Sequence, residues 1–427
     1  MENIKVKGQW TMLWLSYLAL IGCFLPYIGY STQITKIMED TSISYAQTGM
    51  LASVTALVGG LTLPFVGVLV DKWGARNTIL WGLLISSIGQ ILFSYMPDYS
   101  LLVLSRALIG LGVGLLFVGP YTMAAQWFEK SNGVGSAMGV MFSSDGVGTV
   151  FALYLFSYVL TAIGWRHGSA LGGIFLVAVL IIAFIFLKNP PHITDRQNSS
   201  KELGEKFSLK DYLKVIGNRN VIVASAFFIG EWGLYAVIAY WVPTILIEDA
   251  GWSEGLAGFL TSLYVLVGVI PSIIFGLVSD KMGKRKPFIL LAGLWMTLTL
   301  IVLTLALANG NYGLVAFMMP LVGIGVYTGM PVALASAIDS VGTKAVATAN
   351  GFILGIGFVV GGFLYPYIIG YIKDITGAYT VGFIGIIVAT FILNFLASLL
   401  GKDSKKDSNY SEEIKTSDED APVRIYQ

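Results

Sequence analysis

The sequence predicts an all-α membrane protein with twelve transmembrane helices arranged as two similar six-helix bundles. Three observations lead to this prediction. First, 56% of the 427 residues are hydrophobic and only 12% are charged, whereas soluble proteins average about 25% charged residues. Second, the apolar residues gather in twelve runs, each about as long as the 20 helical residues that cross a bilayer. Third, one stretch of the first half recurs in the second half.

The twelve runs are separated by short polar turns, apart from one longer polar stretch after the sixth. In chain order, the predicted spans are 10–34, 45–70, 77–96, 100–127, 132–161, 168–188, 220–247, 255–279, 287–308, 312–336, 345–371 and 379–400.

The distribution of charge between alternate turns predicts the orientation of these spans. With both chain ends placed in the cytoplasm, the positive charges gather on that side, as the positive-inside rule requires. The cytoplasmic side then receives Lys5, Lys7, Lys72, Arg76, Lys130, Lys281, Lys284, Arg285, Lys286 and Lys344. The opposite side receives Lys36, Arg166 and Lys373, with the acidic residues Glu39, Asp40, Asp98, Glu248, Asp249, Glu254 and Asp374. We expect a multi-pass protein of the cell membrane with both termini in the cytoplasm.

Composition also excludes several kinds of chemistry. Lys and Arg number 26 and Asp and Glu 25, so there is no basic surplus of the kind that nucleic-acid binding needs. Cys23 is the only cysteine and His167 and His192 are the only histidines, which argues against disulfides and metal sites. No phosphate-binding loop or hydrolase motif is present, so we expect neither a cofactor nor an enzyme.

The internal repeat is the most informative pattern in the chain. Residues 46–76 (AQTGMLASVTALVGGLTLPFVGVLVDKWGAR) align without a gap on residues 255–285 (GLAGFLTSLYVLVGVIPSIIFGLVSDKMGKR). The offset is constant at 209 positions, as from Gly49 to Gly258. A membrane protein repeated once at half its length is typical of secondary transporters.

The repeat and the polar stretches divide the chain into four parts. We expect an N-terminal bundle at 1–188, a cytoplasmic linker at 189–219, a C-terminal bundle at 220–400 and a disordered cytoplasmic tail at 401–427. Within the linker, SLKDYLKVI is predicted to form a short amphipathic helix on the membrane surface.

Three motifs resemble those of the major facilitator superfamily. Gly67-Val-Leu-Val-Asp-Lys-Trp-Gly-Ala-Arg76 and its second copy, Gly276 to Arg285, resemble the charged loop between spans two and three and between spans eight and nine. The stretch from Arg106 to Gly114 in span four resembles a second motif of that family. The resemblance covers 10–400 and implies the fold of that superfamily and transport by alternating access.

Each charged turn contains a possible ion pair. Arg76 has a carboxylate partner available in Glu129, and Arg285 has one in Asp339, which follows Glu129 by 210 positions. The resemblance implies that these turns latch the two halves together while the cytoplasmic side is closed. The alternative is that the charges only anchor helix ends at the interface. The predicted gate residues are Asp71, Arg76, Glu129, Asp280, Arg285 and Asp339.

Three ionisable residues lie well inside predicted spans, where an unpaired charge costs several kcal/mol and points to function. Arg106 and Glu231 fall in spans four and seven, which line the central cavity in this superfamily, so the resemblance places them facing each other from opposite halves. Arg106 could bind an anionic group while Glu231 takes a proton, or the two could form a structural ion pair. Asp145, in span five, could pair with Arg106 of the same half, and three roles stay open for it: a proton carrier, a helix-packing partner or a residue that faces a solvated cavity.

Aromatic residues also gather on the spans that would line the cavity. Tyr121, Trp232, Tyr235 and Tyr327 offer apolar walls with polar tips and are predicted to contact substrate. The alternative for any tyrosine is an anchor at the membrane interface, which would explain Tyr240 and Tyr30.

These observations predict a secondary transporter that works by alternating access and moves a small organic or inorganic anion with protons, as a symporter. Its partners would be the anionic solute, protons and the lipid bilayer, and one chain could work as a monomer because it contains both halves. One alternative is proton-driven efflux of amphipathic compounds. The other is a membrane sensor or scaffold that kept the fold without transport.

Overall fold

A computed structural model of the chain describes residues 8–128, 134–190, 209–341 and 346–403. Within these residues, twelve helices are long and apolar enough to cross a membrane, so the predicted number of spans is confirmed. Their bounds are Gln9–Thr41, Tyr45–Gly67, Lys72–Tyr95, Tyr99–Phe128, Ala137–Ile163, Trp165–Phe186, Arg219–Glu248, Glu254–Met282, Lys286–Ala308, Tyr312–Ile338, Thr348–Thr376 and Tyr379–Leu399.

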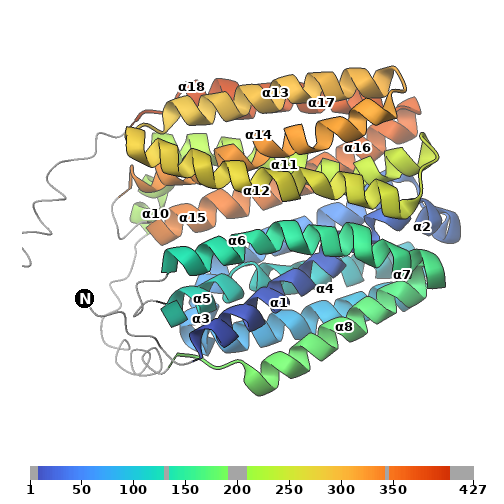
Figure 1. Ribbon diagram of the computed structural model, residues 1–427, viewed down its shortest axis with the longest axis horizontal. Coiled ribbons are helices and arrows are strands. Elements are labelled where there is room, and N and C mark those ends of the chain that lie inside the picture. The colour runs from blue at the N-terminus through green and yellow to red at the C-terminus, as the bar shows by residue number, and fades with distance from the viewer. Residues whose placement is uncertain (1–7, 129–133, 191–208, 342–345, 404–427) are drawn as a thin grey trace, which may run out of the picture.

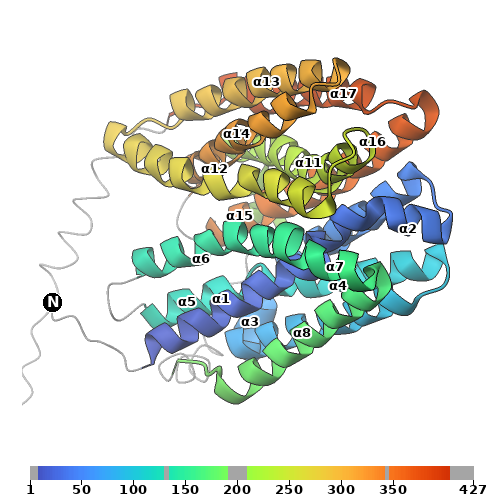
Figure 2. The same cartoon turned by 45° about the vertical axis from the view of Figure 1, so that its right-hand side comes forward.

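The spans form two groups that lie side by side (Figures 1 and 2). The first six spans, coloured blue to green, make up what we call the N half, residues 8–190, and the last six make up the C half, residues 209–403. Together with the likeness to solved structures reported below, this arrangement gives the predicted all-α membrane fold. The exact boundaries of the two bundles remain a proposal.

Several spans are not single regular helices. The first consists of α1 (Gln9–Ile28), the 3₁₀ segment η1 (Gly29–Gln33) and α2 (Ile34–Thr41), and the fourth consists of α4 (Tyr99–Leu116) and α5 (Gly119–Phe128). Three spans contain a π-helical segment, a feature often found at functional sites. The fifth span consists of α6 (Val134–Val150), η3 (Phe151–Leu155) and α7 (Phe156–Ile163). The eleventh consists of α15 (Val346–Ile356), η6 (Gly357–Gly362) and α16 (Phe363–Thr376). The twelfth consists of α17 (Tyr379–Thr390), η7 (Phe391–Leu396) and α18 (Ala397–Leu399).

The remaining spans are regular over longer stretches. They are α3 (Tyr45–Tyr95), α8 (Trp165–Phe186), α11 (Arg219–Glu248), α12 (Glu254–Met282), α13 (Lys286–Ala308) and α14 (Tyr312–Ile338). The helix α3 contains two spans and changes direction at Gly74, whose φ of 80° and ψ of 155° are not helical. The second copy of this turn ends α12 at Gly283, with a φ of 62°. Both copies of the charged turn therefore contain a glycine in a conformation that favours glycine.

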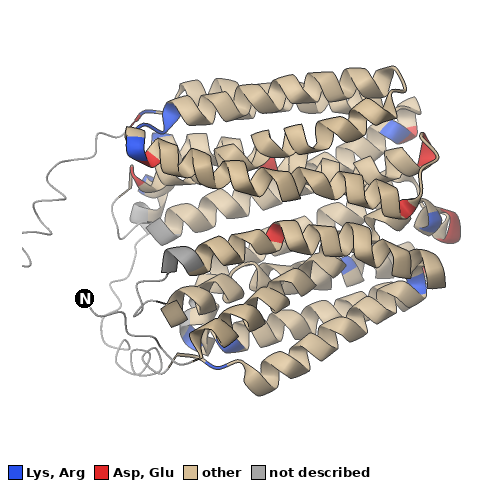
Figure 3. Cartoon of the chain, in the orientation of Figure 1, with Lys and Arg blue, Asp and Glu red and all other residues tan. Residues whose placement is uncertain are grey.

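The helix bundle has two ends. We call the end where α1 begins and α18 ends the near end; it includes the turns at Gly74–Arg76 and Gly283–Lys286. The opposite end, the far end, includes α2 and the turns at Asp249–Ser253 and Gly377–Tyr379. Charged residues colour both ends of the ribbon and few positions between them (Figure 3), as expected for a protein whose middle lies in hydrocarbon.

The burial of the helices shows which of them are central. In α11, 83% of the most apolar window is buried, compared with 28% in α12. Large apolar side chains such as Phe184, Ile185 and Phe186 are exposed on the outside of the bundle, which suits contact with lipid tails. Most side chains of α11 therefore lie in the interior of the molecule.

Only parts of the predicted linker and tail lie among the described residues, and the prediction for both stays untested. The predicted amphipathic segment forms a helix, α10 (Leu209–Ile216), and its place on a membrane surface stays a prediction. Lys402, at the start of the predicted tail, contacts the C half: its N–H donates to Asn220 Oδ1, 3.0 Å away. Residues 191–208 and 404–427 lie outside the described residues.

Candidate functional site

Arg106 lies on α4 with a side chain that is completely buried. Its guanidinium donates to three backbone carbonyls: Leu51 O, 3.0 Å from Nε, Tyr27 O, 2.9 Å from Nη2, and Pro26 O. It also lies 4.4 Å from the centre of the Tyr30 ring. The carbonyls of Pro26 and Tyr27 belong to the end of α1, where the α-helix changes to η1, and that of Leu51 belongs to α3. Arg106 therefore ties the interruption in the first span to the second span.

The structure therefore separates Arg106 from the partners considered in the sequence. Among the described residues, neither Glu231 nor Asp145 forms an ion pair with Arg106, so the pairings considered for it are not formed in this conformation. The physical reason is that the interrupted first span leaves carbonyl oxygens that need a donor inside the protein. Because carbonyls are neutral, they do not cancel the positive charge of Arg106.

Glu231 lies on α11 and is also completely buried. Neither oxygen of its carboxyl group has a hydrogen-bond partner among the described residues. Buried polar groups in native proteins are almost always paired, so an unpaired buried carboxyl is a strong sign of function.

Aromatic side chains surround this part of α11. The ring of Trp232 lies 4.0 Å from that of Phe358 and 5.2 Å from that of Tyr235. Phe117 packs edge-on against Trp232 at 6.3 Å, and Tyr264 lies 5.5 Å from Tyr235. Both halves contribute to this cluster, with Phe117 coming from the N half.

Asp145 and Tyr327 meet across the boundary between the halves. The Tyr327 hydroxyl on α14 donates to Asp145 Oδ2 on α6 over 2.6 Å. Tyr121, on α5, contacts α6. Its hydroxyl donates to Met141 O over 3.5 Å, and the centre of its ring lies 5.4 Å from that of Phe142. The predicted substrate residues are thus distributed over both halves, with one direct bond between them.

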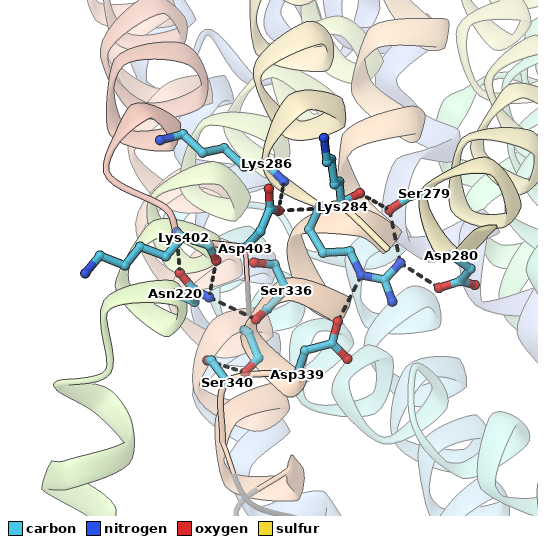
Figure 4. Close-up of polar contacts among 12 residues, drawn as sticks. Asn220, Ser279, Asp280, Lys284, Lys286, Ser336, Asp339, Ser340, Lys402 and Asp403 are labelled. Atoms are coloured by element: carbon cyan, nitrogen blue, oxygen red, sulfur yellow. Dashed lines mark hydrogen bonds and ion pairs between the residues drawn. The ribbon is translucent and has the colours of Figure 1, made fainter. Parts of the chain in front are cut away.

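The charged turn of the C half brings its predicted residues together (Figure 4). Arg285 Nε lies 2.9 Å from Asp339 Oδ2, and Arg285 Nη1 lies 2.6 Å from Asp280 Oδ1. Partial burial alone would lower the pKa of Arg285, but the hydrogen bonds and charges of Asp339 and Asp280 outweigh it and raise that pKa above its ordinary value. This turn is therefore a compact, permanently charged cluster joining α12, α13 and α14.

A residue beyond the last span completes that cluster. Asp403 Oδ1 accepts from the backbone N–H groups of Arg285, at 2.7 Å, and Lys286, at 2.8 Å. The N half repeats this arrangement, since the Arg76 N–H donates to Asn189 Oδ1 over 3.0 Å. In each half, the segment that leaves the last span thus binds the charged turn.

The other contacts of the turn in the N half differ from those in the C half. Arg76 donates to Leu187 O and Phe184 O, both at 2.6 Å, at the end of α8. The predicted partner Glu129 lies outside the described residues, as does the side chain of Asp71. The Arg76–Glu129 pair therefore stays a prediction.

The glycines of the repeat show how the halves meet. A Cβ atom on Gly49 would lie 2.5 Å from Pro366 O, and one on Gly258 would collide with Leu153 O, in each case backbone of the opposite half. The glycines eighteen positions later in each copy, Gly67 and Gly276, would have no atom within 4 Å of an added Cβ. Both copies of the repeat therefore touch the opposite half at Gly49 and Gly258, whereas a side chain at Gly67 or Gly276 would meet open space.

Some residues of this region were not predicted from the sequence. Phe117, Tyr264 and Phe358 lie in apolar runs, where an aromatic residue carries no special signal. Tyr240 and Tyr30 were assigned to the membrane interface, but both are buried, and the Tyr240 hydroxyl donates to Tyr27 O over 2.8 Å. That assignment is wrong because the interrupted first span brings its carbonyls and rings into the interior.

Among the described residues, no group of three His, Cys, Asp or Glu side chains could hold a metal ion.

The chain belongs to the Major Facilitator Superfamily. The model of this family matches residues 11–256 and 234–424, which together cover nearly the whole sequence. The resemblance inferred from the charged turns is thus confirmed, and the chain is a member of a family of transporters rather than an enzyme.

Several relatives match over most of their length. The nitrite extrusion protein of Bacillus subtilis (strain 168) is 22% identical over 403 residues, 91% of this chain and 94% of that protein. A probable sulfoacetate transporter of Cupriavidus necator is 24% identical over 89% of this chain and 90% of its own. A probable nitrate transporter of Staphylococcus epidermidis is 22% identical over 88% of this chain and 92% of its own.

Solved structures share the fold. A bacterial homologue of the human lysosomal transporter Spinster, crystallised in an inward-facing and unoccupied conformation, matches with a TM-score of 0.74. The match covers 94% of this chain and 99% of that chain at 16% identity, so it shows the common fold alone.

Proposed function

We propose that this protein is a secondary transporter that moves a small anion across the cell membrane together with protons, as a symporter working by alternating access. The observation that carries the proposal is the buried, unpaired carboxyl group of Glu231 at the aromatic cluster of α11. The likeness to a nitrite extrusion protein, a probable nitrate transporter and a probable sulfoacetate transporter supports an anionic solute.

Proton binding follows from the surroundings of Glu231. An ionised carboxylate without a partner in such an interior costs several kcal/mol, whereas the protonated group is far less costly. A transporter that must bury Glu231 in this conformation can therefore do so by loading a proton. In our proposal Asp145, Tyr121, Trp232, Tyr235 and Tyr327 complete the site.

In this proposal Arg106 favours the anion through its positive charge and not through the direct contact that was expected from the sequence. Since neutral carbonyls hold it, its positive charge is not cancelled and makes the interior more favourable for an anion. We propose that Arg106 contributes this potential while it fixes the first span, instead of contacting the substrate in this conformation.

The glycines of the repeat support alternating access. The far-end positions of both copies, Gly49 and Gly258, approach backbone of the opposite half, while the near-end positions, Gly67 and Gly276, are open. Rocking the halves about the centre would exchange these two arrangements without breaking either bundle. We propose that the charged turns close the near end in the alternative conformation.

The proposal is tested by flux measurements in proteoliposomes that contain a pH-sensitive dye. Nitrite, nitrate, sulfoacetate and small carboxylates are supplied one at a time, and we expect one of them to cause a pH change that depends on the protein. Glu231→Gln should abolish the pH change while the substrate still binds. Asp98→Asn, which neutralises an exposed carboxylate, is the control and should behave as wild type.

Continued proton movement in Glu231→Gln at an unchanged ratio to substrate would refute this role. A substrate that moves without protons would favour anion exchange, which we keep as a second candidate because one relative is a probable nitrate/nitrite antiporter of Thermus thermophilus, 25% identical over 64% of this chain. Loading the vesicles with a second anion separates the two, since only exchange requires the internal anion.

The proposed orientation has its own test. With Cys23 replaced by Ala, single cysteines at Lys284 (near end) and Asn309 (far end) are treated with a membrane-impermeant maleimide in intact cells. We expect labelling at Asn309 and none at Lys284 until the cells are opened, because positive charge stays on the cytoplasmic side. The reverse pattern would overturn the proposed orientation.

A further inference from the structure

The N-terminus of α3 is capped by residues of both halves. Its own side chains satisfy two backbone donors: Ser44 Oγ accepts from the Gln47 N–H at 3.3 Å, and Gln47 Oε1 accepts from the Ser44 N–H at 2.9 Å. The next two donors bind Asp374 at the end of α16, with Tyr45 N–H at 3.0 Å and Ala46 N–H at 2.8 Å. The cap is complete only while the C half lies against the N half.

A second set of contacts surrounds the first. The hydroxyl groups of Tyr45 and Tyr379 both donate to Glu248 Oε2, at 3.0 and 3.2 Å. The Lys373 ammonium lies 4.2 Å from the centre of the Tyr379 ring and 5.5 Å from that of Tyr45. Tyr45 therefore joins three elements of the C half, α11, α16 and α17, through its backbone, its hydroxyl and its ring.

An ion pair and a close helix contact extend this contact region. Lys36 Nζ on α2 lies 2.6 Å from Glu254 Oε1 at the start of α12. A Cβ atom on Gly370 would collide with Tyr45 O, so α16 reaches α3 only because position 370 has no side chain. The halves thus meet at the far end through charges, hydrogen bonds and backbone.

We propose that Tyr45, Asp374, Glu248, Tyr379, Lys36 and Glu254 form a gate that closes the far end of the transport pathway, which we call the far-end gate. Asp374 is its central positioning residue, because its carboxylate accepts from two backbone N–H groups that have no partner within their own helix and faces the positive end of α3. The inference rests on the proposed alternating access, and it assigns to particular residues the contacts that must break when the far end opens.

The surroundings of the gate allow it to open without a large penalty. A hollow of about 560 Å³ lies at this end, and Lys36, Tyr45, Glu248 and Lys373 line it together with Glu39 and Asp249. Water that enters on separation can hydrate the carboxylates and the N–H groups of α3 in place of their present partners. Contacts of this kind hold one conformation in preference to the other and remain reversible.

The test measures the distance across the far end in liposomes, without substrate. In a Cys23→Ala background, spin labels are attached to cysteines at Tyr95 of the N half and Asn309 of the C half, and pulsed electron resonance gives the distance distribution. Asp374→Asn should increase the ratio of long to short distances about fivefold or more, since it removes the charge facing the α3 N-terminus. Gly370→Ala should have a larger effect, because the added methyl group blocks the close approach.

Each variant has a control of the same chemistry. Asp98 also caps a helix, accepting from the Leu101 N–H at 3.0 Å, but within the N half. Gly385 on α17 has no atom within 4 Å of a built Cβ. Asp98→Asn and Gly385→Ala should leave the distance distribution as in wild type.

Unchanged distances in both Asp374→Asn and Gly370→Ala would overturn the gate. If Gly370→Ala does not fold, the distance distribution of Asp374→Asn alone decides whether the gate holds the far end closed. A second label pair at Phe186 and Met282 reports on the near end and separates the gate from the proposed function. If the label distance increases at the far end and does not decrease at the near end, the result supports the gate and counts against rocking of the halves.

Discussion

Arg106 connects the first span to the middle of the N half through three carbonyl oxygens. A lysine keeps the charge but cannot donate in three directions from a planar group. We expect Arg106→Lys to lower the free energy of unfolding by about 2–4 kcal/mol, since each hydrogen bond to a buried charge contributes about 1.5–3 kcal/mol. Thermal or urea unfolding in detergent measures this loss.

Arg166 provides the control for that substitution. It binds Asp40 at 2.9 Å and the carbonyls of Ser94 and Met96, but about a third of its side chain is exposed. Arg166→Lys should therefore change the free energy of unfolding by only about 1 kcal/mol or less. Equal losses in the two variants would show that the carbonyl contacts of Arg106 are not what stabilises the first span.

The bond between Tyr327 and Asp145 is the polar contact between predicted substrate residues of the two halves. In a double-mutant cycle of Tyr327→Phe and Asp145→Asn, we expect a coupling free energy of about 1.5–3 kcal/mol, because the acceptor is a carboxylate. The neutral pair Tyr17 and Ser143, 3.1 Å apart within the N half, should give about 0.5–1.5 kcal/mol. A coupling near zero for Tyr327 and Asp145 would mean that they act independently.

At the scale of the element, the two charged turns share one motif with different contacts. Asp280→Asn breaks the 2.6 Å contact to Arg285, and Asp71→Asn changes the equivalent position of the N half. We expect each to slow turnover up to about fivefold while substrate affinity stays the same, since a partly exposed ion pair contributes about 1 kcal/mol at most. Transport rates and binding are measured at equal expression.

Asp40→Asn is the matched control for the turns, because it removes an ion pair at the opposite end of the bundle within one half. It should leave turnover as in wild type. If Asp71→Asn and Asp280→Asn also transport at the wild-type rate, the turns only anchor helix ends.

At the scale of the whole molecule, two glycines of α12 are expected to differ. Gly258→Ala places a methyl group against the Leu153 carbonyl of the N half and should destabilise the protein by about 1–3 kcal/mol. The methyl group of Gly276→Ala meets open space in this conformation. This substitution should raise the free energy of unfolding by up to about 1 kcal/mol, because alanine favours the helix over glycine. Unfolding measurements on both variants check this; equal effects would contradict the observed packing of the halves.

The sequence alone determined the number of spans, the separation of charges between two ends and the repeat of the charged turn. These features are readable because a bilayer requires long apolar helices and because charges and turns concentrate outside it. The contact between Arg285 and Asp339 was also foreseen, since both residues flank short turns whose position the spans fix.

Tertiary structure alone decided which partners the buried groups have. Arg106 binds the carbonyls of an interrupted helix, Tyr327 reaches Asp145, and Asp374 caps a helix of the opposite half. No spacing in the sequence specifies these contacts, because they depend on where separate helices bend and on how the two halves lean against each other. The spans follow from local composition, whereas the site and the gate follow from packing between residues that lie 79 to 328 positions apart in the sequence.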